Sequence, residues 1–290
     1  MATMPEATMP DRRLKLRPMT AMDVASVHAL SLGEQWPHRK QDIADTLALG
    51  AGTVAEIGGQ IIGSAMWWLH GHHTATLGMF IVAKPFRGGG IGRIVMDTVL
   101  DRIGQRSILL NANHGGLPMF RKFCFTGISE ILQHQGTSFS VPLLPLAEGE
   151  RIRPMGESDH LRVTDMAQAA TGLERPTIMA AVLDKGHGVV LDCSGEVAGF
   201  ALFRRFGRGY VIGPVVAPDQ DRAKALIAQW LGSRSGEFMR LDIPGECGLG
   251  DWLEELGLIR VHRFVTMVRG DEPRPSRPGQ SFGIISQSLF

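Results

Sequence analysis

The chain repeats itself, and this repeat is the feature that most constrains its fold. The segment "LKLRPMTAMD" at 14–23 returns as "ERIRPMGESD" at 150–159, so that Arg17 matches Arg153 and Asp23 matches Asp159, each 136 positions further on (153 − 17 and 159 − 23). The same spacing relates "GGQIIGSAM" at 58–66 to "SGEVAGFAL" at 194–202. Self-similarity at a fixed spacing is typical of a duplicated structural unit. We therefore expect two copies of one domain.

The length of the chain fits a duplication. Its 290 residues, of which 44% are apolar, are enough to bury the cores of two domains of ordinary size. Prolines interrupt regular pairing in "PLLPLAEGE" at 142–150. We expect a first domain at 1–141, a linker at 142–149 and a second domain at 150–290.

The charge and cysteine content argue against several classes of partner. Thirty basic and 29 acidic residues leave a net charge of +1, so no global field attracts nucleic acid or an anionic membrane. The opening "MATMPEATMPDRR" lacks the apolar core of a signal peptide, and no apolar run approaches the roughly 20 residues of a membrane span. The three cysteines have no CxxC spacing. We expect a cytoplasmic chain with reduced thiols and no metal, nucleic-acid or membrane partner.

The hydrophobic pattern of the first copy predicts an ordered set of elements. A strand at 14–18 precedes a helix capped by Thr20 and a second helix at 38–49. "TVAEIG" and "QIIGSAMWWL" flank Gly58 and Gly59 as a hairpin, and "TATLGMFIV" is a third extended run. An amphipathic helix at 90–103 then precedes the short apolar strand "SILLNA". The apolar face of that helix would carry Ile91, Ile94, Val95, Val99 and Ile103.

Four glycines stand in "VAKPFRGGGIGRIV", 82–95, between an apolar strand and this helix. Glycine lets the backbone turn with several amides pointing one way, and a helix N-terminus adds partial positive charge, so such a turn can hold phosphate oxygens. The segment lacks the Gly-Lys-Ser/Thr of a Walker A loop and the GxGxxG spacing of dinucleotide sites. The alternative is a glycine turn without a ligand.

The motif Arg87-x-x-Gly90-x-Gly92, which follows "MFIV" and opens a helix, resembles the R/Q-x-x-G-x-G/A signature of the GNAT superfamily of acyl-CoA-dependent N-acyltransferases. The order of elements over 14–140 is similar to that of a GNAT domain, and "LPMFRKFCF" at 117–125 stands where the family has a segment like "LYEKLGF". The second copy resembles the C-terminal GNAT-like domain of tandem bacterial acetyltransferases. The resemblance implies an α/β (α+β) fold of two tandem GNAT-like domains, each a mixed, mostly antiparallel sheet flanked by helices.

The resemblance also implies acetyl-CoA as the co-substrate of the first copy. Backbone groups of the strand ending at Phe80, Ile81 and Val82 would hold the pantetheine arm and polarise the thioester carbonyl. Asn113 would hydrogen-bond the cofactor, and Phe120, which replaces the family tyrosine, would pack against it. Because phenylalanine has no proton to donate, solvent is left to protonate the thiolate. The pyrophosphate would be held by Arg87, Gly88, Gly89, Gly90, Ile91 and Gly92.

The implied reaction is direct attack of a neutral amine on the thioester, without an acyl-enzyme. Glu34, in "SLGEQWPHR", is the candidate base, because this loop borders the acceptor cleft in the family, and an exposed loop carboxylate without a catalytic role is the alternative. Trp36 with Glu34 would bind an ammonium group, and core packing is the alternative for Trp36. In "WWLHGHH" at 67–73, Trp68 and His70 share one face of a strand and would line the cleft. The three histidines of this segment could suggest a metal site, but we favour the end of a hairpin.

The second copy departs from the pattern where a cofactor would bind. After "VVAP" it runs "DQDRAKAL", with no glycine and with carboxylates at Asp219 and Asp221 that would repel phosphate. We therefore assign one acetyl-CoA to the first copy, and we expect the second copy to wall the acceptor site or to brace the first domain. The segment "FGIISQSLF" at 282–290 is expected to return as a strand that completes the second copy.

The expected function is N-acetyltransfer to the primary amine of a small molecule. A protein lysine or N-terminal acetyltransferase and a non-catalytic acyl-CoA sensor stay open as alternatives. A homodimer also stays open.

Overall fold

The structure is a computed structural model that describes residues 13–139, 141–142, 144–277 and 279–290. Two compact units are distinguished: unit 1 comprises Met1–Trp67 and Met79–Gly104, and unit 2 comprises Trp68–Gly78 and Gln105–Phe290. The chain passes between them within strands β3 (Gln60–His70) and β4 (Thr74–Val82). Residues 1–12 of the predicted first domain and position 143 of the predicted linker lie outside the described residues. The domain limits 1–141 and 150–290 follow the repeat and stay a prediction.

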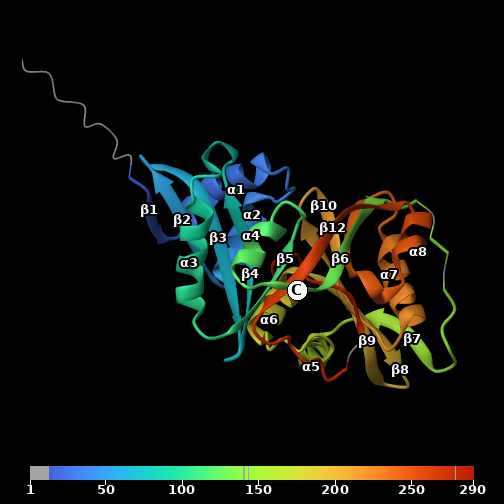
Figure 1. Ribbon diagram of the computed structural model, residues 1–290. Coiled ribbons are helices and arrows are strands. Elements are labelled where there is room, and N and C mark those ends of the chain that lie inside the picture. Colours follow the sequence, from blue (N-terminus) through green and yellow to red (C-terminus); the bar gives the residue numbers. More distant parts are fainter. Residues whose placement is uncertain (1–12, 140, 143, 278) are drawn as a thin grey trace, which may run out of the picture. The chain divides into compact units, whose positions relative to one another are not determined.

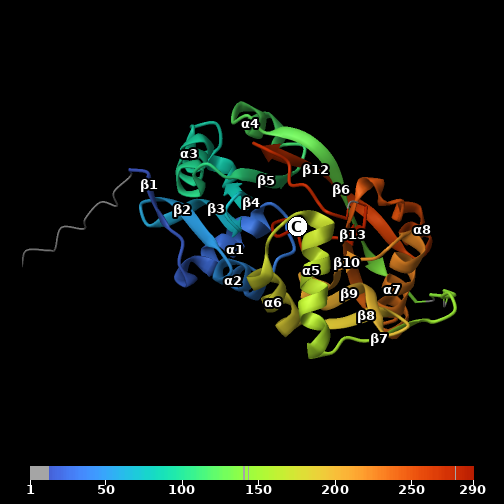
Figure 2. The ribbon, with the colours of Figure 1, turned by 90° about the horizontal axis from the view of Figure 1, so that it is seen from below.

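Unit 1 is a layered α/β structure. Strand β1 (Lys15–Pro18) pairs antiparallel with β2 (Ala51–Ile57), and β2 pairs antiparallel with β3. Helices α1 (Val24–Gly33) and α2 (Lys40–Ala48) lie on one face of these strands, and α3 (Ile91–Ile103) lies on the other (Figure 2). Gly58 and Gly59 close the predicted hairpin with φ values of 58° and 81°, which glycine adopts without strain.

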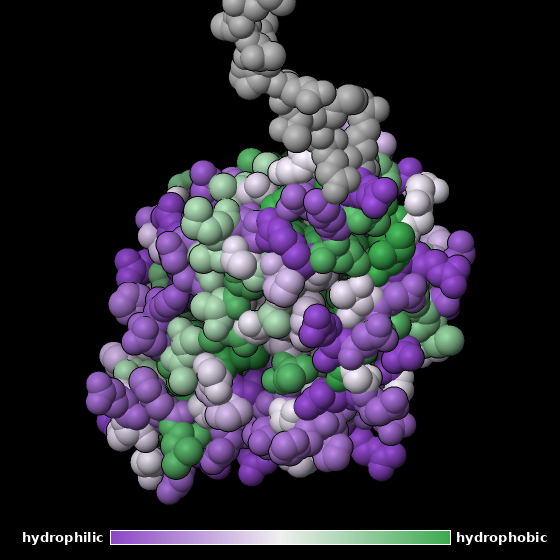
Figure 3. All heavy atoms as spheres, turned by 90° about the vertical axis from the view of Figure 1, so that its left-hand side faces the viewer, coloured by the Kyte–Doolittle hydropathy of each residue, from purple (hydrophilic) through white to green (hydrophobic). Residues whose placement is uncertain are grey.

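One residue on the predicted apolar face of α3 is misplaced. Ile91, Val95, Val99 and Ile103 are buried as predicted, but Ile94 is 43% exposed. The buried face of the helix is centred near Val99. Ile94 lies five positions earlier, about 140° away around the helix axis, so its side chain faces outward. The space-filling view of this side of the molecule accordingly mixes hydrophilic and hydrophobic side chains (Figure 3).

Unit 2 is built on a sheet in which strands of the two copies are exchanged. Strand β6 of the first copy lies between β12 and β11 of the second, while β12 pairs with β5 of the first (Figure 1). This exchange explains why residues 105–139 belong to the same unit as the second copy. In spatial order the strands are β5 (Ser107–Ala112), β12 (Leu258–Arg269), β6 (Thr126–Thr137), β11 (Phe238–Pro244), β10 (Gly209–Val216), β9 (Glu196–Phe206), β8 (His187–Cys193) and β7 (Glu150–Pro154).

Helices cover both faces of the second-copy strands. Helices α5 (His160–Thr171) and α6 (Pro176–Lys185) lie on one side, and α7 (Gln220–Ser233) packs on the other (Figure 2). Short helices α4 (Leu117–Lys122) and α8 (Gly250–Glu255) precede β6 and β12.

Within the described residues, no helix is both long and apolar enough to cross a membrane. Single 3-10 turns lie at Ala21–Asp23, Lys84–Phe86, Glu157–Asp159 and Gly245–Cys247.

The repeated sequence motif builds the same ion-pair cluster twice. Arg17 donates to both carboxylate oxygens of Asp23 at 2.8 Å and to Glu56 at 3.0 Å. Arg153 donates to Asp159 at 2.7 and 2.9 Å and to Asp192 at 2.9 Å. The hydrogen bond from Arg17 lowers the pKa of Asp23 to about 2. Corresponding clusters at the repeat distance, with Glu56 in the first and Asp192 in the second, confirm the two tandem copies.

The last strand, β13 (Ser281–Gly283), is shorter than predicted. It pairs antiparallel with β10. After it, the amide of Ile285 donates to the Phe290 carbonyl at 3.1 Å and the amide of Phe290 donates to the Ser286 carbonyl at 3.0 Å, which closes a tight turn. The predicted strand is therefore wrong beyond Gly283. A strand would bury alternate residues, whereas this turn buries Ile284, Ile285, Leu289 and Phe290 together.

Candidate functional site

The glycine turn of unit 1 leads from β4 into helix α3. Gly88 and Gly90 have φ values of 84° and 82°, in the left-handed region that glycine favours. The backbone amides of residues 88–93 donate to no protein group within the described part of the chain, and the first bond of the helix runs from the Ile94 amide to the Gly90 carbonyl at 3.2 Å. Six consecutive amides therefore remain open to an anion at the positive end of a 13-residue helix.

The space beside this turn is open because the residues are glycines. A Cβ atom built on Gly88 or Gly90 would meet no atom within 4 Å, and one built on Gly89 would meet only the Phe86 carbonyl at 3.9 Å. Phosphate oxygens can thus approach the backbone closely. The assignment of this turn to the pyrophosphate of a cofactor stays a prediction.

Arg87 and Glu34, which the sequence assigns to different tasks, form an ion pair within unit 1. The Arg87 guanidinium donates through Nη2 to Oε1 of Glu34 and through Nε to the Val82 carbonyl at 2.8 Å. This side chain therefore ties the end of β4 to the loop that follows α1. Oε2 of Glu34 has no hydrogen-bond partner among the described residues, so it can accept a proton or contact an ammonium group.

Strand β4 carries an irregularity at Met79, which the sequence analysis missed. Met79 has a φ of 49°, an uncommon conformation for a residue other than glycine and one that concentrates at functional sites. Its carbonyl accepts a hydrogen bond from the Ser64 hydroxyl at 2.9 Å. The irregularity immediately precedes Phe80–Val82, the segment predicted to hold the pantetheine arm. A glycine at position 78, inside a strand, was the available sequence signal.

The parallel strands β4 and β5 separate within unit 2. Their paired positions end at Thr76 and Leu109. Beyond that rung, Asn111 of β5 accepts a hydrogen bond from the Thr266 hydroxyl at 2.7 Å and donates to the Gln287 carbonyl at 3.1 Å. We call this point, defined by Thr76, Gly78, Leu109 and Asn111, the vertex. Ligands of open α/β sheets commonly bind beyond the carboxyl ends of strands.

Trp68 and His70 lie in the interior of unit 2, so the prediction that they line an open cleft is not met by this structure. Trp68 is 0% exposed and His70 is 2% exposed, because the strand face that they share is covered. Nε2 of His70 lies 3.0 Å from the Thr76 hydroxyl. Burial, assisted by the charge of Arg175, lowers the pKa of His70 to about 3, so the ring is neutral at pH 7.

The remaining predicted contact residues have local roles in the structure. Oδ1 of Asn113 accepts the Gly116 amide at 2.9 Å and so closes the turn into α4. Phe120 is buried and packs edge-on against Phe125, with 5.9 Å between ring centroids. Trp36, in unit 1, is half-buried and lies edge-on to His38 at 6.0 Å. Their contacts with a cofactor or an acceptor stay a prediction.

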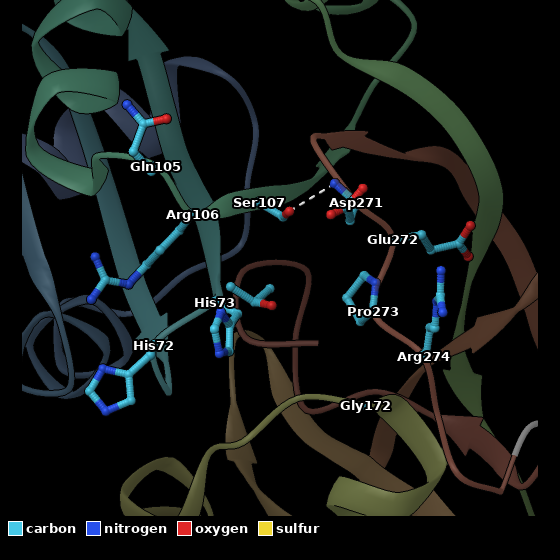
Figure 4. A pocket seen from close by; sticks show the side chains of 11 residues that line it. His72, His73, Gln105, Arg106, Ser107, Gly172, Asp271, Glu272, Pro273 and Arg274 are labelled. Atoms are coloured by element: carbon cyan, nitrogen blue, oxygen red, sulfur yellow. Dashed lines mark hydrogen bonds between the residues drawn. The ribbon is translucent and has the colours of Figure 1, made fainter.

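A polar hollow of about 520 Å³ lies at the other end of the β4–β5 pair in unit 2 (Figure 4). His72 and His73 lie on one side of it and Asp271 and Glu272 on the other, where the Asp271 amide donates to Oγ of Ser107 at 2.8 Å. A group of three or more His, Cys, Asp or Glu side chains that could hold a metal is not found among the described residues. We assign no chemistry to this hollow, because it lies at the amino ends of the two strands.

In the second copy, the positions that correspond to the glycine turn and the vertex are filled by protein. Oδ1 of Asp219 accepts the Arg222 amide at 2.9 Å and thereby caps helix α7. Strands β10 and β11 pair in parallel only at Tyr210 and Val211. Beyond them, β13 pairs with β10, and the Ile284 amide donates to the Asp242 carbonyl of β11 at 2.9 Å. The terminal strand therefore occupies the space between these two strands.

Comparison with known proteins agrees with the two copies. Residues 22–125 match a model of the acetyltransferase (GNAT) family, and residues 163–283 match a model of an acetyltransferase (GNAT) domain. The "Uncharacterized N-acetyltransferase YitH" of Bacillus subtilis is 26% identical over 245 residues, which cover 80% of this chain and 82% of that protein.

Solved structures share the fold over nearly the whole chain. A structure from Pyrococcus horikoshii has a TM-score of 0.77 at 17% identity and covers 96% of both chains. A tandem GNAT protein from the clavulanic acid biosynthesis pathway has a TM-score of 0.67 at 14% identity, over 91% of this chain and 100% of that one. With both copies matched by GNAT models, the chain belongs to the GNAT superfamily, as a tandem member of this class of acyltransferases.

Proposed function

We propose that this acyltransferase uses acetyl-CoA to acetylate the primary amine of a small molecule. The observation that carries the proposal is the run of six open amides at residues 88–93. Pyrophosphate is an anion with several acceptor oxygens, and amides at a helix N-terminus complement it in both charge and hydrogen bonding. The residues present therefore fit the diphosphate of coenzyme A.

The proposed cofactor contacts follow from the position of the turn. Arg87, Gly88, Gly89, Gly90, Ile91 and Gly92 would hold the pyrophosphate. Backbone groups of Phe80, Ile81 and Val82 would hold the pantetheine arm along β4, with Asn113 and Phe120 as further contacts. Acetyl-CoA supplies an activated acetyl group, and every contact named here serves to orient its thioester for attack.

Glu34 is the proposed general base. An amine is protonated at neutral pH and must lose a proton before it attacks. Oε1 of Glu34 is held by Arg87, which fixes the direction of the carboxylate and leaves Oε2 to take that proton. The amine nitrogen would then form a bond to the thioester carbonyl carbon and lose a second proton to solvent as the C–S bond breaks. Solvent protonates the departing thiolate, because Phe120 offers no proton.

A small acceptor is supported by the burial of Thr76 at the vertex and of His70, which lies beside it. Thr76 is fully buried and His70 nearly so. Buried groups of this kind are reached more readily by a small amine than by the surface of a folded protein. Equilibrium titration with acetyl-CoA should give one site per chain, and release of free thiol in a panel of amino sugars, amino acids, polyamines and arylalkylamines should identify the acceptor.

Other outcomes of these measurements would contradict the proposal. Absence of acetyl-CoA binding would refute the cofactor assignment. Binding without thiol release for any amine or peptide would indicate a sensor, and release with lysine-containing peptides alone would indicate a protein acetyltransferase.

Substitution of Glu34 tests the proposed base. Glu34→Gln keeps an oxygen for Arg87 but cannot take a proton, so kcat should fall about 100-fold while the Kd for acetyl-CoA changes little. Glu56→Gln is a matched control, because Glu56 also pairs with an arginine, Arg17 at 3.0 Å, but belongs to β2 and does not pair with Arg87. A wild-type kcat in Glu34→Gln would remove Glu34 from the mechanism.

A further inference from the structure

The turn at residues 284–290, here named the terminal turn, is held in unit 2 by side chains from distant elements. Arg175 donates to the Leu289 carbonyl at 2.7 Å and to the Phe290 carbonyl, and Arg204 donates to the Ile285 carbonyl. Arg175 is only 3% exposed. Burial of a charged side chain is costly unless its hydrogen bonds repay it, so the terminal turn is held firmly in one conformation.

The terminal turn lies against the vertex of β4 and β5. A Cβ atom at Gly78 would come within 2.3 Å of Oγ of Ser288, so the close approach of the turn depends on glycine. On the other strand, Nδ2 of Asn111 donates to the Gln287 carbonyl at 3.1 Å. A segment of the second copy thus contacts both strands of the first copy at the point where they separate.

The side chain of Gln287 is left without a partner at this position. Its Nε2 and Oε1 atoms are both buried, and neither has a hydrogen-bond partner among the described residues. A buried polar group without a partner costs free energy, and native proteins contain few of them. Nearby, Nε2 of His70 pairs with Thr76 and Asn111 pairs with Thr266, whereas Nδ1 of His70 is also buried without a partner among the described residues. Gln287 therefore presents a fixed donor and acceptor that folding does not use.

We propose that Gln287 binds the acceptor substrate, an inference that rests on the proposed N-acetyltransferase function. The proposed cofactor contacts all come from the first copy, whereas Gln287 comes from the second, so the acceptor is its natural ligand. A primary amide both donates and accepts. Its best partner is a group that does the same, which points to amines that also carry a hydroxyl or an amide.

The test replaces the amide by an apolar group of similar size. In Gln287→Met, the KM for an amino alcohol or amino sugar should rise about tenfold, while the KM for a matched alkylamine and the Kd for acetyl-CoA stay unchanged. Glucosamine with cyclohexylamine, and ethanolamine with propylamine, are suitable pairs of probes. Gln229→Met, on the exposed face of α7, is the matched control.

Thermal unfolding separates binding from a purely structural role. Removal of an unpartnered buried amide should leave the melting temperature of Gln287→Met equal to or above that of the wild type. A lower melting temperature together with an unchanged KM would overturn the inference, as would an unchanged preference for hydroxylated amines. If the wild type binds no acetyl-CoA, the proposed function fails first and the role of Gln287 falls with it.

Discussion

The two copies share a fold and a sequence motif, yet they differ at the helix that follows their fourth strand. In the first copy, glycines leave the amides of residues 88–93 open, whereas in the second copy Asp219 accepts the Arg222 amide at 2.9 Å. Strands β4 and β5 stop pairing at Thr76 and Leu109, and in the second copy β13 fills the position beside β10. A duplicated fold can thus fill one of two corresponding turns with its own chain and keep its architecture.

The difference extends into the core of the strands. His70 on β3 corresponds to Phe206 on β9, 136 positions further on (206 − 70). Both side chains are buried, at 2% and 8% exposure. Burial of the His70 imidazole next to the vertex costs free energy in the first copy, whereas the second copy packs an apolar ring at the corresponding position. Stability alone explains the second arrangement but not the first.

The largest expected effect comes from closing the open turn of the first copy. Gly89→Glu adds bulk and negative charge where phosphate should bind, so acetyl-CoA affinity should fall at least about 100-fold. Gly89 suits this test better than Gly90, because its φ is not in the left-handed region and a Cβ there meets nothing closer than 3.9 Å. Gly232→Glu, at an exposed position of α7 with open space, is the control. Unchanged acetyl-CoA affinity, measured by calorimetry in a folded Gly89→Glu variant, would refute the assignment of phosphate binding to this turn.

A smaller effect is expected when the strand that fills the second copy is weakened. Phe282 is 4% exposed on β13, and Phe282→Ala should lower the free energy of unfolding by about 3–5 kcal/mol. Denaturant titration measures this, with Phe139→Ala as a control because Phe139 is 77% exposed. The variant should still bind one acetyl-CoA, because α7 remains capped. Two bound cofactors would show that β13 alone excludes the second.

The smallest effect is expected at the cap of α7. Asp219→Ala removes an N-cap and should cost about 1 kcal/mol in unfolding free energy. Asp221→Ala is the matched control, since Asp221 lies in the first turn of the same helix but does not cap it. Because β13 still fills the space between β10 and β11, the stoichiometry of acetyl-CoA should stay at one per chain. A second weak site in Asp219→Ala would mean that the cap, and not the strand, closes this copy.

The sequence by itself determined the elements of this fold. The repeat, the Gly58–Gly59 hairpin, the helix after the glycines and the strand "SILLNA" are all encoded in short windows, because turns need particular backbone angles and amphipathic periods are local. The wrong prediction for Ile94 has the same origin. The apolar pattern identifies a helix, but the elements that pack against the helix decide whether a residue at the edge of its apolar face is buried or exposed.

Only the tertiary structure decided how these elements combine. The pair Arg87–Glu34 joins residues 53 positions apart, and the contact of Asn111 with Gln287 joins residues 176 apart. The exchange of β6 and β12 is equally non-local, because either copy offers a strand of the same pattern to the same neighbours. Likewise, the burial of Trp68 and His70 depends on what packs over their strand. Local propensity specifies each segment, whereas the choice among similar partners depends on which arrangement buries the most surface and satisfies the most hydrogen bonds.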